Sequence, residues 1–222
     1  MKLTTRSNLI AAAGAAAMAL LCAPPAAGAL TTVAPGDELD TIQTGNMERC
    51  TLGYSYTRRH VTYAITAGHC NNRPSRYVVD RRTGAIGHYL VSVADPDKPT
   101  TADYALIAFD GGTGTIPNMY GTPVTGIAAP SKAAPICHDG IRTGIACGEL
   151  AGRLDGYQYL TTGMPRSIPG DSGGPVWQPT DGGGATIVGI WLGEHLPGDG
   201  RDYGRFIALP DAIAGINAHL PV

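Results

Sequence analysis

The chain has 222 residues, of which 43% are hydrophobic and only 15% charged, and its formal net charge is −2. This length and apolar content suffice for one large domain or two small ones, and they exclude an intrinsically disordered chain. The slight acidic excess argues against nucleic acid or an anionic membrane as the partner, because both favour a basic protein surface.

The first 29 residues have the pattern of a secretory signal peptide. Lys2 and Arg6 precede an apolar run over residues 9–21, and residues 27–29 are small, as signal peptidase requires. The run is shorter than the roughly 20 apolar residues that a membrane-spanning helix needs. We therefore predict a secreted protein, extracellular or in the cell envelope, without membrane insertion. Its mature chain begins near Leu30 and has 14 basic and 18 acidic residues, a net charge of −4.

Removal of the signal peptide takes away Cys22 and leaves four cysteines. Lipid attachment at Cys22 is the alternative, but the bulky Leu21 stands where that modification favours a small residue. An even number of cysteines in a secreted chain favours disulfides, and we predict the pairs that close short local loops. These pairs are Cys50 with Cys70 and Cys137 with Cys147. A zinc site at His69-Cys70 and Cys137-His138 is the competing interpretation, although it lacks Cys-x-x-Cys spacing and the compartment is unfavourable.

From about Cys50 to Leu209 the apolar residues come in short bursts separated by Gly, Pro, Asn and Asp, which is typical of an all-β chain. The first half offers four bursts and the second half seven. Those of the first half cover residues 60–67, 76–80, 85–93 and 103–110. Those of the second half cover residues 122–130, 134–140, 145–154, 157–163, 173–179, 186–194 and 203–209.

These bursts predict two antiparallel six-stranded β-barrels with a cleft between them, since a closed barrel has no exposed sheet edge. Residues 117–130 carry three prolines and little charge, so we place the connection between the halves there. The predicted boundaries are an N-terminal arm over residues 30–47, a first barrel over 48–120 and a second over 121–222. A short C-terminal helix is predicted from Pro210, Ile213, Ile216 and Leu220.

Three polar residues stand at the ends of predicted strands or in a glycine-rich turn. His69 lies in "TAGHC", Asp103 opens "DYALIAF", and Ser172 lies in "PGDSGGPV". Acyl transfer at neutral pH needs a hydroxyl nucleophile, a base that titrates near pH 7, and a carboxylate that orients this base. The three side chains supply these groups if the fold brings them together.

In this order, "TAGHC", "DYALI" and "GDSGGP" resemble the three signature segments of chymotrypsin-like serine proteases, nearest to the short secreted bacterial members. The match covers about Cys50 to the C-terminus. The resemblance implies a catalytic triad of His69, Asp103 and Ser172, and an oxyanion hole made by the backbone N–H groups of Gly170 and Ser172. It implies no metal and no organic cofactor. Five further histidines lack such context, and we interpret them as structural or surface residues: His60, His88, His138, His195 and His219.

Asp171 departs from the family pattern in what surrounds it. A buried carboxylate needs a cation, which the bacterial relatives supply as an arginine directly after a cysteine like Cys137. This chain has His138 there, so we expect Arg142, four residues further on, to take that place. The long pro-region of many relatives is also missing, so either folding needs none or residues 30–47 form a short inhibitory arm.

The residues expected around the substrate side chain leave its chemistry open. Leu192 and Glu194 stand where the family presents a serine and an open glycine-rich edge. Leu192 would weaken the support of Asp103, and Glu194 would either accept a basic substrate side chain or narrow the pocket. Met164 or Arg166 falls at the base of the pocket, where they favour apolar and acidic side chains respectively.

We therefore predict a monomeric secreted serine endopeptidase whose partner is a peptide or protein substrate. Two alternatives use the same residues. One is a protease-like fold kept as a binding module with weak or no catalysis, which His138 and Leu192 favour. The other is an esterase that uses the same triad.

Overall fold

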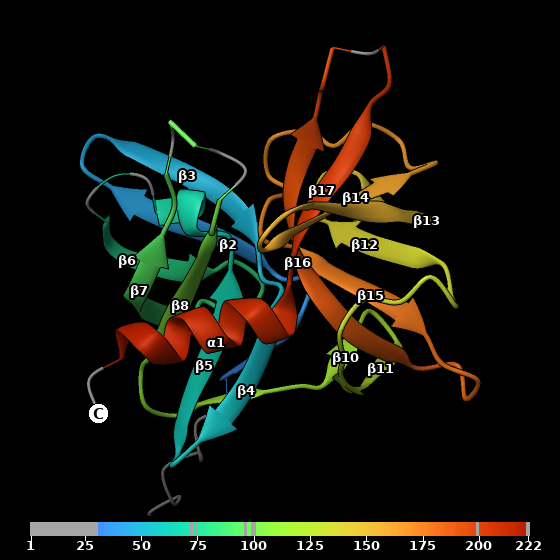
Figure 1. Ribbon diagram of the computed structural model, residues 1–222. Helices are drawn as coiled ribbons and strands as arrows, with labels where there is room; N and C mark the ends of the chain where they lie inside the picture. The colour runs from blue at the N-terminus through green and yellow to red at the C-terminus, as the bar shows by residue number, and fades with distance from the viewer. Residues whose placement is uncertain are drawn as a thin grey trace, which may run out of the picture.

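The computed structural model describes residues 31–220 except positions 72, 74, 96, 99, 100 and 199. The predicted signal peptide, with the cysteine at position 22, lies outside the described residues. Figure 1 shows two bodies of β-strands side by side, with the helix α1 lying across the first of them. Within the described residues, no helix is long and apolar enough to cross a membrane.

The first body is a seven-stranded antiparallel sheet in the order β3-β2-β6-β7-β8-β5-β4. No pairing joins β3 to β4 within the described residues, so the sheet stays open at these two edges. The prediction of a closed six-stranded barrel is therefore wrong for this half, which is an open half-barrel. Its strands are β2 (Glu38–Gln43), β3 (Asn46–Thr51), β4 (Tyr54–Arg58), β5 (Val61–Thr66), β6 (Ser75–Asp80), β7 (Ile86–Val93) and β8 (Tyr104–Phe109).

Residues 31–47, which we expected to form a separate arm, are built into this body. β1 (Thr31–Val33) pairs in parallel with β9 (Thr113–Thr115), and β2 lies between β3 and β6. Asp37, just before β2, is 2% exposed and accepts two hydrogen bonds from Arg82, at 2.6 and 2.7 Å. A segment with strand partners on both sides is a component of the sheet and not a detachable inhibitory arm.

The second body is an eight-stranded sheet in the order β10-β11-β16-β15-β12-β13-β14-β17. A further pairing between β16 and β17 closes the strands from β12 to β17 into a six-stranded barrel, as predicted for this half. β10 and β11 lie in the predicted connection and extend the barrel at β16, with which β11 pairs in parallel. The strands are β10 (Asn118–Met119), β11 (Thr122–Ile127), β12 (Ile136–Gly140), β13 (Gly144–Asp155), β14 (Gln158–Thr162), β15 (Pro175–Pro179), β16 (Ala185–His195) and β17 (Tyr203–Ala208).

The C-terminal helix α1 (Leu209–His219) begins with Pro210 in its first turn, as the sequence predicts. Its approach to β8 depends on Gly215, because a Cβ at this position would overlap the side chain of Tyr104. The close contact places the helix against the strand that directly follows Asp103. The residues buried on the inner face of the helix are Leu209, Ala212 and Ile216.

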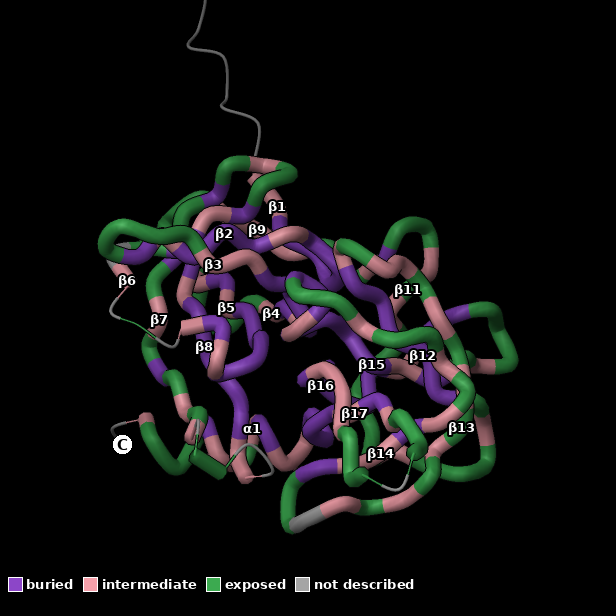
Figure 2. Tube along the Cα trace, turned by 90° about the horizontal axis from the view of Figure 1, so that it is seen from above, coloured by how far each residue is buried: buried purple, intermediate pink, exposed green. Residues whose placement is uncertain are grey.

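One large apolar cluster joins the two bodies and the helix. It includes Ile65 and Leu106 from the first sheet, Ile190 and Ile207 from the second, and Ile216 from α1. In Figure 2 the buried stretches run through the centre of the molecule and the exposed stretches form its rim. The two halves share this core, so the cluster fixes how segments from the two sheets meet.

Candidate active site

His69 is held by a short 3₁₀ turn, η1 (Gly68–Asn71), that follows β5. Gly68 allows this turn to lie against β7 and β8, because a Cβ there would overlap backbone atoms of both strands. The adjacent Cys70 forms a disulfide with Cys50 of β3, which confirms the first predicted pair. The turn is therefore tied to three strands of the first sheet, and the position of His69 is fixed by covalent and packing constraints.

His69 and Asp103 are in direct contact. The His69 Nδ1 lies 2.7 Å from Oδ2 of Asp103, and the backbone N–H of His69 donates to Oδ1 at 3.0 Å. Asp103 is 7% exposed, whereas the side chain of His69 is 34% exposed. A proton on Nδ1 that is donated to the carboxylate leaves Nε2 as the ring nitrogen that can accept a proton.

Ser172 lies in a turn whose glycines adopt conformations that other residues rarely take. The backbone φ is +113° at Gly170 and +87° at Gly173. The N–H of Asp171 closes the turn on the carbonyl of Ile168 at 3.2 Å. The N–H groups of Gly170 and Ser172 have no acceptor among the described residues. Both amides are therefore unpaired within the described chain, and both residues line the adjoining pocket.

One pocket of about 320 Å³ brings these groups together. His69 reaches it from the first sheet and Ser172 from the second body, so the pocket lies where the two bodies meet. No hydrogen bond joins the Ser172 hydroxyl to the His69 ring, a contact that is often long in unliganded enzymes and tightens with substrate. The lining residues are Glu48, His69, Ser167, Ile168, Pro169, Gly170, Ser172, Gly193 and Glu194.

Several known proteins are similar to this chain in sequence or in fold. No protein-family model matches the chain. The uncharacterized protein Rv1815 of Mycobacterium tuberculosis is 32% identical over 197 residues, which cover 83% of this chain and 86% of that protein. Streptogrisin-A of Streptomyces griseus is 27% identical over 188 residues, or 81% of this chain and 58% of that protein. Protease A of Thermobifida fusca matches in structure with a TM-score of 0.63, covering 84% of this chain and 97% of that chain at 20% identity. This chain is a homologue of Rv1815 and has the chymotrypsin-like serine protease fold.

Contrary to our expectation, no cationic side chain contacts the Asp171 carboxylate among the described residues. The carboxylate is fully buried, and its partners in the described residues are all neutral donors. Oδ1 accepts the backbone N–H groups of Arg142 and Thr143, at 2.9 and 3.1 Å. Oδ2 accepts the hydroxyl of Thr143 at 2.9 Å, the N–H of Ile168 at 3.1 Å and the hydroxyl of Ser167 at 3.4 Å. Arg142 therefore contributes its amide and not its guanidinium, and five donors replace the ion pair that we expected.

His138, which directly follows Cys137 where the resemblance led us to expect an arginine, is a neutral core residue. It is fully buried and stacks on Trp191, with 4.1 Å between ring centroids and an interplanar angle of 9°. Burial lowers the pKa of His138 to about 4, against the opposing effect of Asp171. The Nε1–H of Trp191 donates to Ser167 Oγ at 3.0 Å, and Ser167 in turn contacts Asp171. The stack therefore packs the region behind the Ser172 turn without adding a charge.

Asp139 is a second titratable group in this buried region. It follows His138 in β12 and is 5% exposed. Burial and the nearby charge of Asp171 raise the pKa of Asp139 to about 6. Its Oδ2 has no hydrogen-bond partner among the described residues. The carboxyl group is therefore less stable in its ionised form here than in water.

Thr51, at the end of β3, is a residue that the sequence reasoning missed. Its hydroxyl donates to the carbonyl of Gly170 at 2.8 Å and accepts the N–H of Ile141 at 3.2 Å. Its backbone N–H donates to the carbonyl of Ser172 at 2.8 Å, and its own carbonyl accepts the Thr66 hydroxyl at 2.9 Å. Thr51 thus binds the turn at two carbonyls from the opposite body. Its only sequence signal is its place directly after Cys50.

The four residues predicted around the substrate side chain lie in different environments. Glu194 lines the pocket with His69 and Ser172. Leu192 is 3% exposed and belongs to the apolar core. Met164 packs against the cluster around Trp191, and Arg166 forms an exposed ion pair with Asp202 at 3.5 Å. Of the four, Glu194 alone is among the lining residues.

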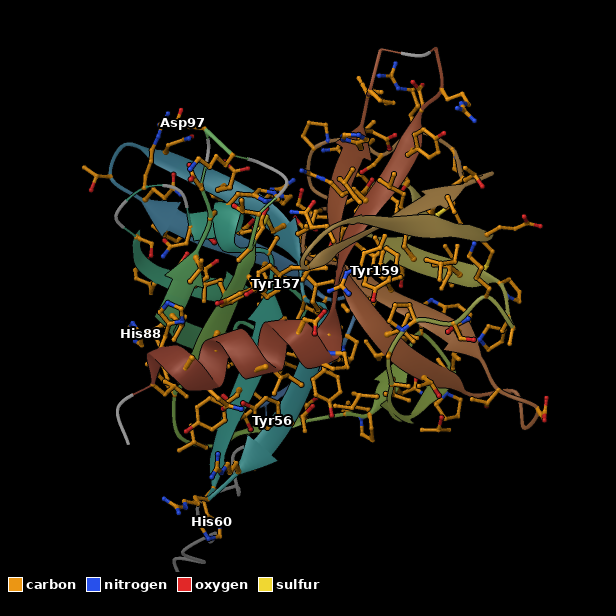
Figure 3. The ribbon with its side chains drawn as sticks, viewed as in Figure 1. Tyr56, His60, His88, Asp97, Tyr157 and Tyr159 are labelled. Atoms are coloured by element: carbon orange, nitrogen blue, oxygen red, sulfur yellow. A yellow bond between two sulfur atoms is a disulfide. The ribbon has the colours of Figure 1, made fainter. Side chains whose placement is uncertain are left out.

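The remaining histidines and cysteines supply no second catalytic or metal centre in the described part of the chain. Figure 3 shows His60 at the tip of the hairpin formed by β4 and β5, and His88 on the first sheet. The second predicted disulfide, Cys137 with Cys147, is present, so Cys70 and Cys137, the two cysteines of the zinc interpretation, are each bound in a disulfide. No group of three metal-ligating side chains occurs among the described residues.

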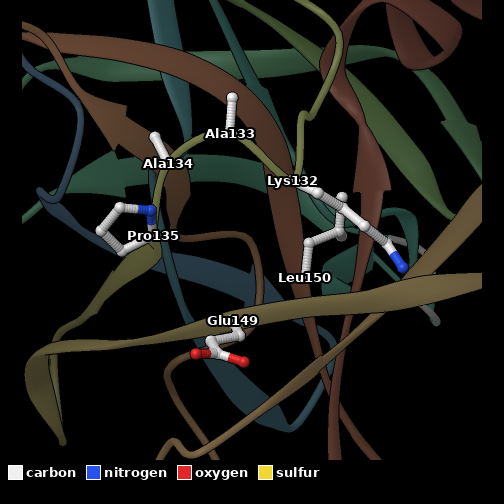
Figure 4. A pocket seen from close by; sticks show the side chains of 6 residues that line it. All are labelled: Lys132, Ala133, Ala134, Pro135, Glu149 and Leu150. Atoms are coloured by element: carbon white, nitrogen blue, oxygen red, sulfur yellow. The ribbon is translucent and has the colours of Figure 1, made fainter.

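A separate hollow of about 500 Å³ lies on the second barrel (Figure 4). The segment that leads into β12 and the adjacent part of β13 form its walls. Lys132 and Glu149 are its charged residues, and none of the predicted site residues lines it. The hollow is therefore distinct from the pocket at His69 and Ser172.

Proposed function

We propose that this protein is a secreted serine endopeptidase that hydrolyses peptide bonds through an acyl-enzyme. The observation that carries the proposal is the 2.7 Å contact between His69 and Asp103 beside a pocket that Ser172 also lines. These are the three groups that acyl transfer requires. Two disulfides support a location outside the reducing cytoplasm.

In the first half of the reaction, Ser172 Oγ bonds to the carbonyl carbon of the scissile peptide while His69 Nε2 takes the hydroxyl proton. The carbonyl oxygen becomes negative and accepts the N–H groups of Gly170 and Ser172. Asp103 stabilises the imidazolium that forms on His69. His69 then gives its proton to the amine nitrogen as the carbon–nitrogen bond breaks.

In the second half, His69 takes a proton from a water molecule, whose oxygen attacks the acyl carbon. The same two amides stabilise the second tetrahedral intermediate. The bond to Ser172 Oγ breaks, His69 returns its proton to this oxygen, and the carboxylic acid product leaves.

The alternative of a catalytically silent binding module was based on His138 and Leu192. Five donors to Asp171 hold the carboxylate without an arginine, and His138 fills the space as a neutral ring. Leu192 lies in the core, while Asp103 keeps two contacts to His69. Neither substitution therefore argues for lost activity, and we favour the enzyme.

Covalent labelling tests the proposal. Mature protein with both disulfides formed is expected to react with a fluorophosphonate probe, and Ser172→Ala is expected to remove the label completely. His69→Ala should slow labelling by at least a hundredfold, whereas His60→Ala, at an exposed histidine, serves as the matched control. Absence of labelling in folded wild-type protein would favour the binding module. Parallel assays with peptide and ester substrates that share the same acyl group separate an endopeptidase from an esterase.

A further inference from the structure

We propose that the substrate carries a basic residue, lysine or arginine, whose side chain is bound by Glu194 next to the reacting bond. This inference rests on the proposed function, because it assigns the substrate class of the same site. Glu194 lies near the end of β16 and lines the pocket together with His69 and Ser172. A group bound by Glu194 therefore occupies the pocket that holds the nucleophile.

The carboxylate of Glu194 is held in place by the facing wall of the pocket. Its Oε1 accepts the backbone N–H of Ser167 at 2.6 Å. The other oxygen, Oε2, has no hydrogen-bond partner among the described residues, so it remains available to a donor on the substrate. A carboxylate with one oxygen fixed and one open is oriented before the ligand arrives, which reduces the ordering cost of binding.

The charges around the pocket favour a cation over an anion. Of the nine lining residues, Glu48 and Glu194 are acidic and none is lysine or arginine. The positive charge of Arg166 acts on Glu194, but Arg166 lies outside the lining set, is 66% exposed and pairs with Asp202 at 3.5 Å. A substrate glutamate would therefore meet two carboxylates without a compensating cation.

The burial of Glu194 and the composition of the pocket wall also favour a cationic substrate side chain. Burial raises the pKa of Glu194 because its charged form is poorly solvated, and a substrate cation would offset this cost. Ile168 and Pro169 line the same pocket and provide apolar surface for the methylene stem of a lysine or arginine. The hydroxyl of Ser167 already contacts Trp191 and Asp171, so Glu194 is the lining residue of the second body whose carboxylate is fixed by one oxygen and can receive a basic head group at the other.

The test compares wild type, Glu194→Gln and Glu149→Gln on peptides that differ in one side chain. This side chain is arginine, lysine, norleucine or glutamate. Glutamine at position 194 keeps an oxygen for the Ser167 N–H and removes only the charge. We expect the wild type to prefer arginine over norleucine in kcat/KM, and this ratio to fall at least tenfold in Glu194→Gln. The ratio should change by less than threefold in Glu149→Gln, which alters the net charge by the same amount at an exposed residue outside this pocket.

Two readouts separate this inference from the proposed function. Fluorophosphonate labelling of each variant reports the nucleophile alone, so a labelled wild type with equal rates on arginine and norleucine peptides overturns the inference and leaves the function standing. Binding of benzamidine to Ser172→Ala, measured by calorimetry, reports the cation site without catalysis. We expect this binding to weaken at least tenfold when Glu194→Gln is added; an unchanged affinity would also overturn the assignment.

Discussion

Removing the hydroxyl of Thr51 tests whether the first sheet holds the turn that carries Ser172. Thr51→Val keeps the shape of the side chain and replaces Oγ1 by a methyl group. The carbonyl of Gly170 then loses its donor at 2.8 Å, and the N–H of Ile141 loses its acceptor at 3.2 Å. Thr51 is fully buried, so water does not readily replace either bond.

The size of the effect follows from these two bonds. A neutral hydrogen bond contributes about 1 kcal/mol to stability, and a buried group left without a partner costs about 1–3 kcal/mol. We therefore expect Thr51→Val to lower the free energy of unfolding by about 2–4 kcal/mol. The freed carbonyl belongs to Gly170, whose N–H is a proposed oxyanion donor. Complete loss of such a donor costs about a hundredfold in kcat or more, so a partial displacement should cost about tenfold.

The assay is chemical denaturation together with kcat and KM on one peptide substrate. Thr51→Ser keeps the hydroxyl and should retain kcat within about threefold. Thr62→Val provides the stability control, because Thr62 is buried, its hydroxyl donates to the carbonyl of Thr113 in β9, and neither residue lines the pocket. It should lose stability with little change in kcat. An unchanged kcat in folded Thr51→Val, or equal losses in the valine and serine variants, would refute the role of the hydroxyl.

Three further outcomes follow from the same contacts. Gly170→Ala should lower kcat about a hundredfold with a small change in KM, because alanine does not readily adopt a φ of +113° and its Cβ would press on Arg142. A normal kcat would show that this amide is not an oxyanion donor. The double variant Cys50→Ser/Cys70→Ser should lose about 3 kcal/mol of stability for a loop of 20 residues and should slow catalysis by loosening His69, as thermal unfolding and kcat will show. Asp139, with a pKa raised from 3.8 to about 6, keeps its proton when the unfolded chain has released it, so it destabilises the native state increasingly between about pH 4 and 6. Asp139→Asn should therefore raise the free energy of unfolding by up to about 3 kcal/mol at pH 8 and by very little at pH 4, and an equal effect at both values would contradict the assignment.

The features that the sequence predicts well are those that depend on short segments. The glycines of "GDSGGP" predict a turn with unusual backbone angles, and Gly170 and Gly173 adopt positive φ. Both disulfides join cysteines close in sequence, so the local pairing is correct. The contact of His69 with Asp103 follows from the family segments, because each segment stands at the end of a strand whose apolar pattern is clear.

The strand β2 could not be found from its pattern, because buried residues lie on both of its faces and several of them are polar. Asp40 and Thr41 are buried there, at 8% and 0% exposure. The negative charge of Asp40 is balanced by Arg49 in the neighbouring strand β3, whose Nε lies 3.1 Å from Asp40 Oδ1. Hydrophobic periodicity detects apolar residues on one face, and it fails where a buried carboxylate has its cation on another strand. Without β2, the first half was predicted as a closed barrel preceded by an arm.

The environment of Asp171 shows a second limit. The sequence predicts a cationic partner for this carboxylate, whereas the structure binds it with three backbone amides and two hydroxyls. Almost every residue carries an amide, so nothing in the sequence marks those of Arg142, Thr143 and Ile168 as the ones that converge. The hairpin between β12 and β13 directs two of them, and the turn before Ser172 directs the third.

The turn that carries Ser172 is hydrogen-bonded from two sides, by the second barrel and by the first sheet. The hairpin of the second barrel holds Asp171 through Thr143, and the first sheet holds the carbonyls of Gly170 and Ser172 through Thr51. An ion pair within one barrel would depend little on the other body, whereas the bonds of Thr51 exist only while the two bodies are in contact. The shared apolar core also spans both bodies. Separation of the halves would therefore move His69 away from Ser172 and release the turn that carries Ser172 in one step. Activity should therefore disappear together with tertiary structure during unfolding, without a folded but inactive intermediate.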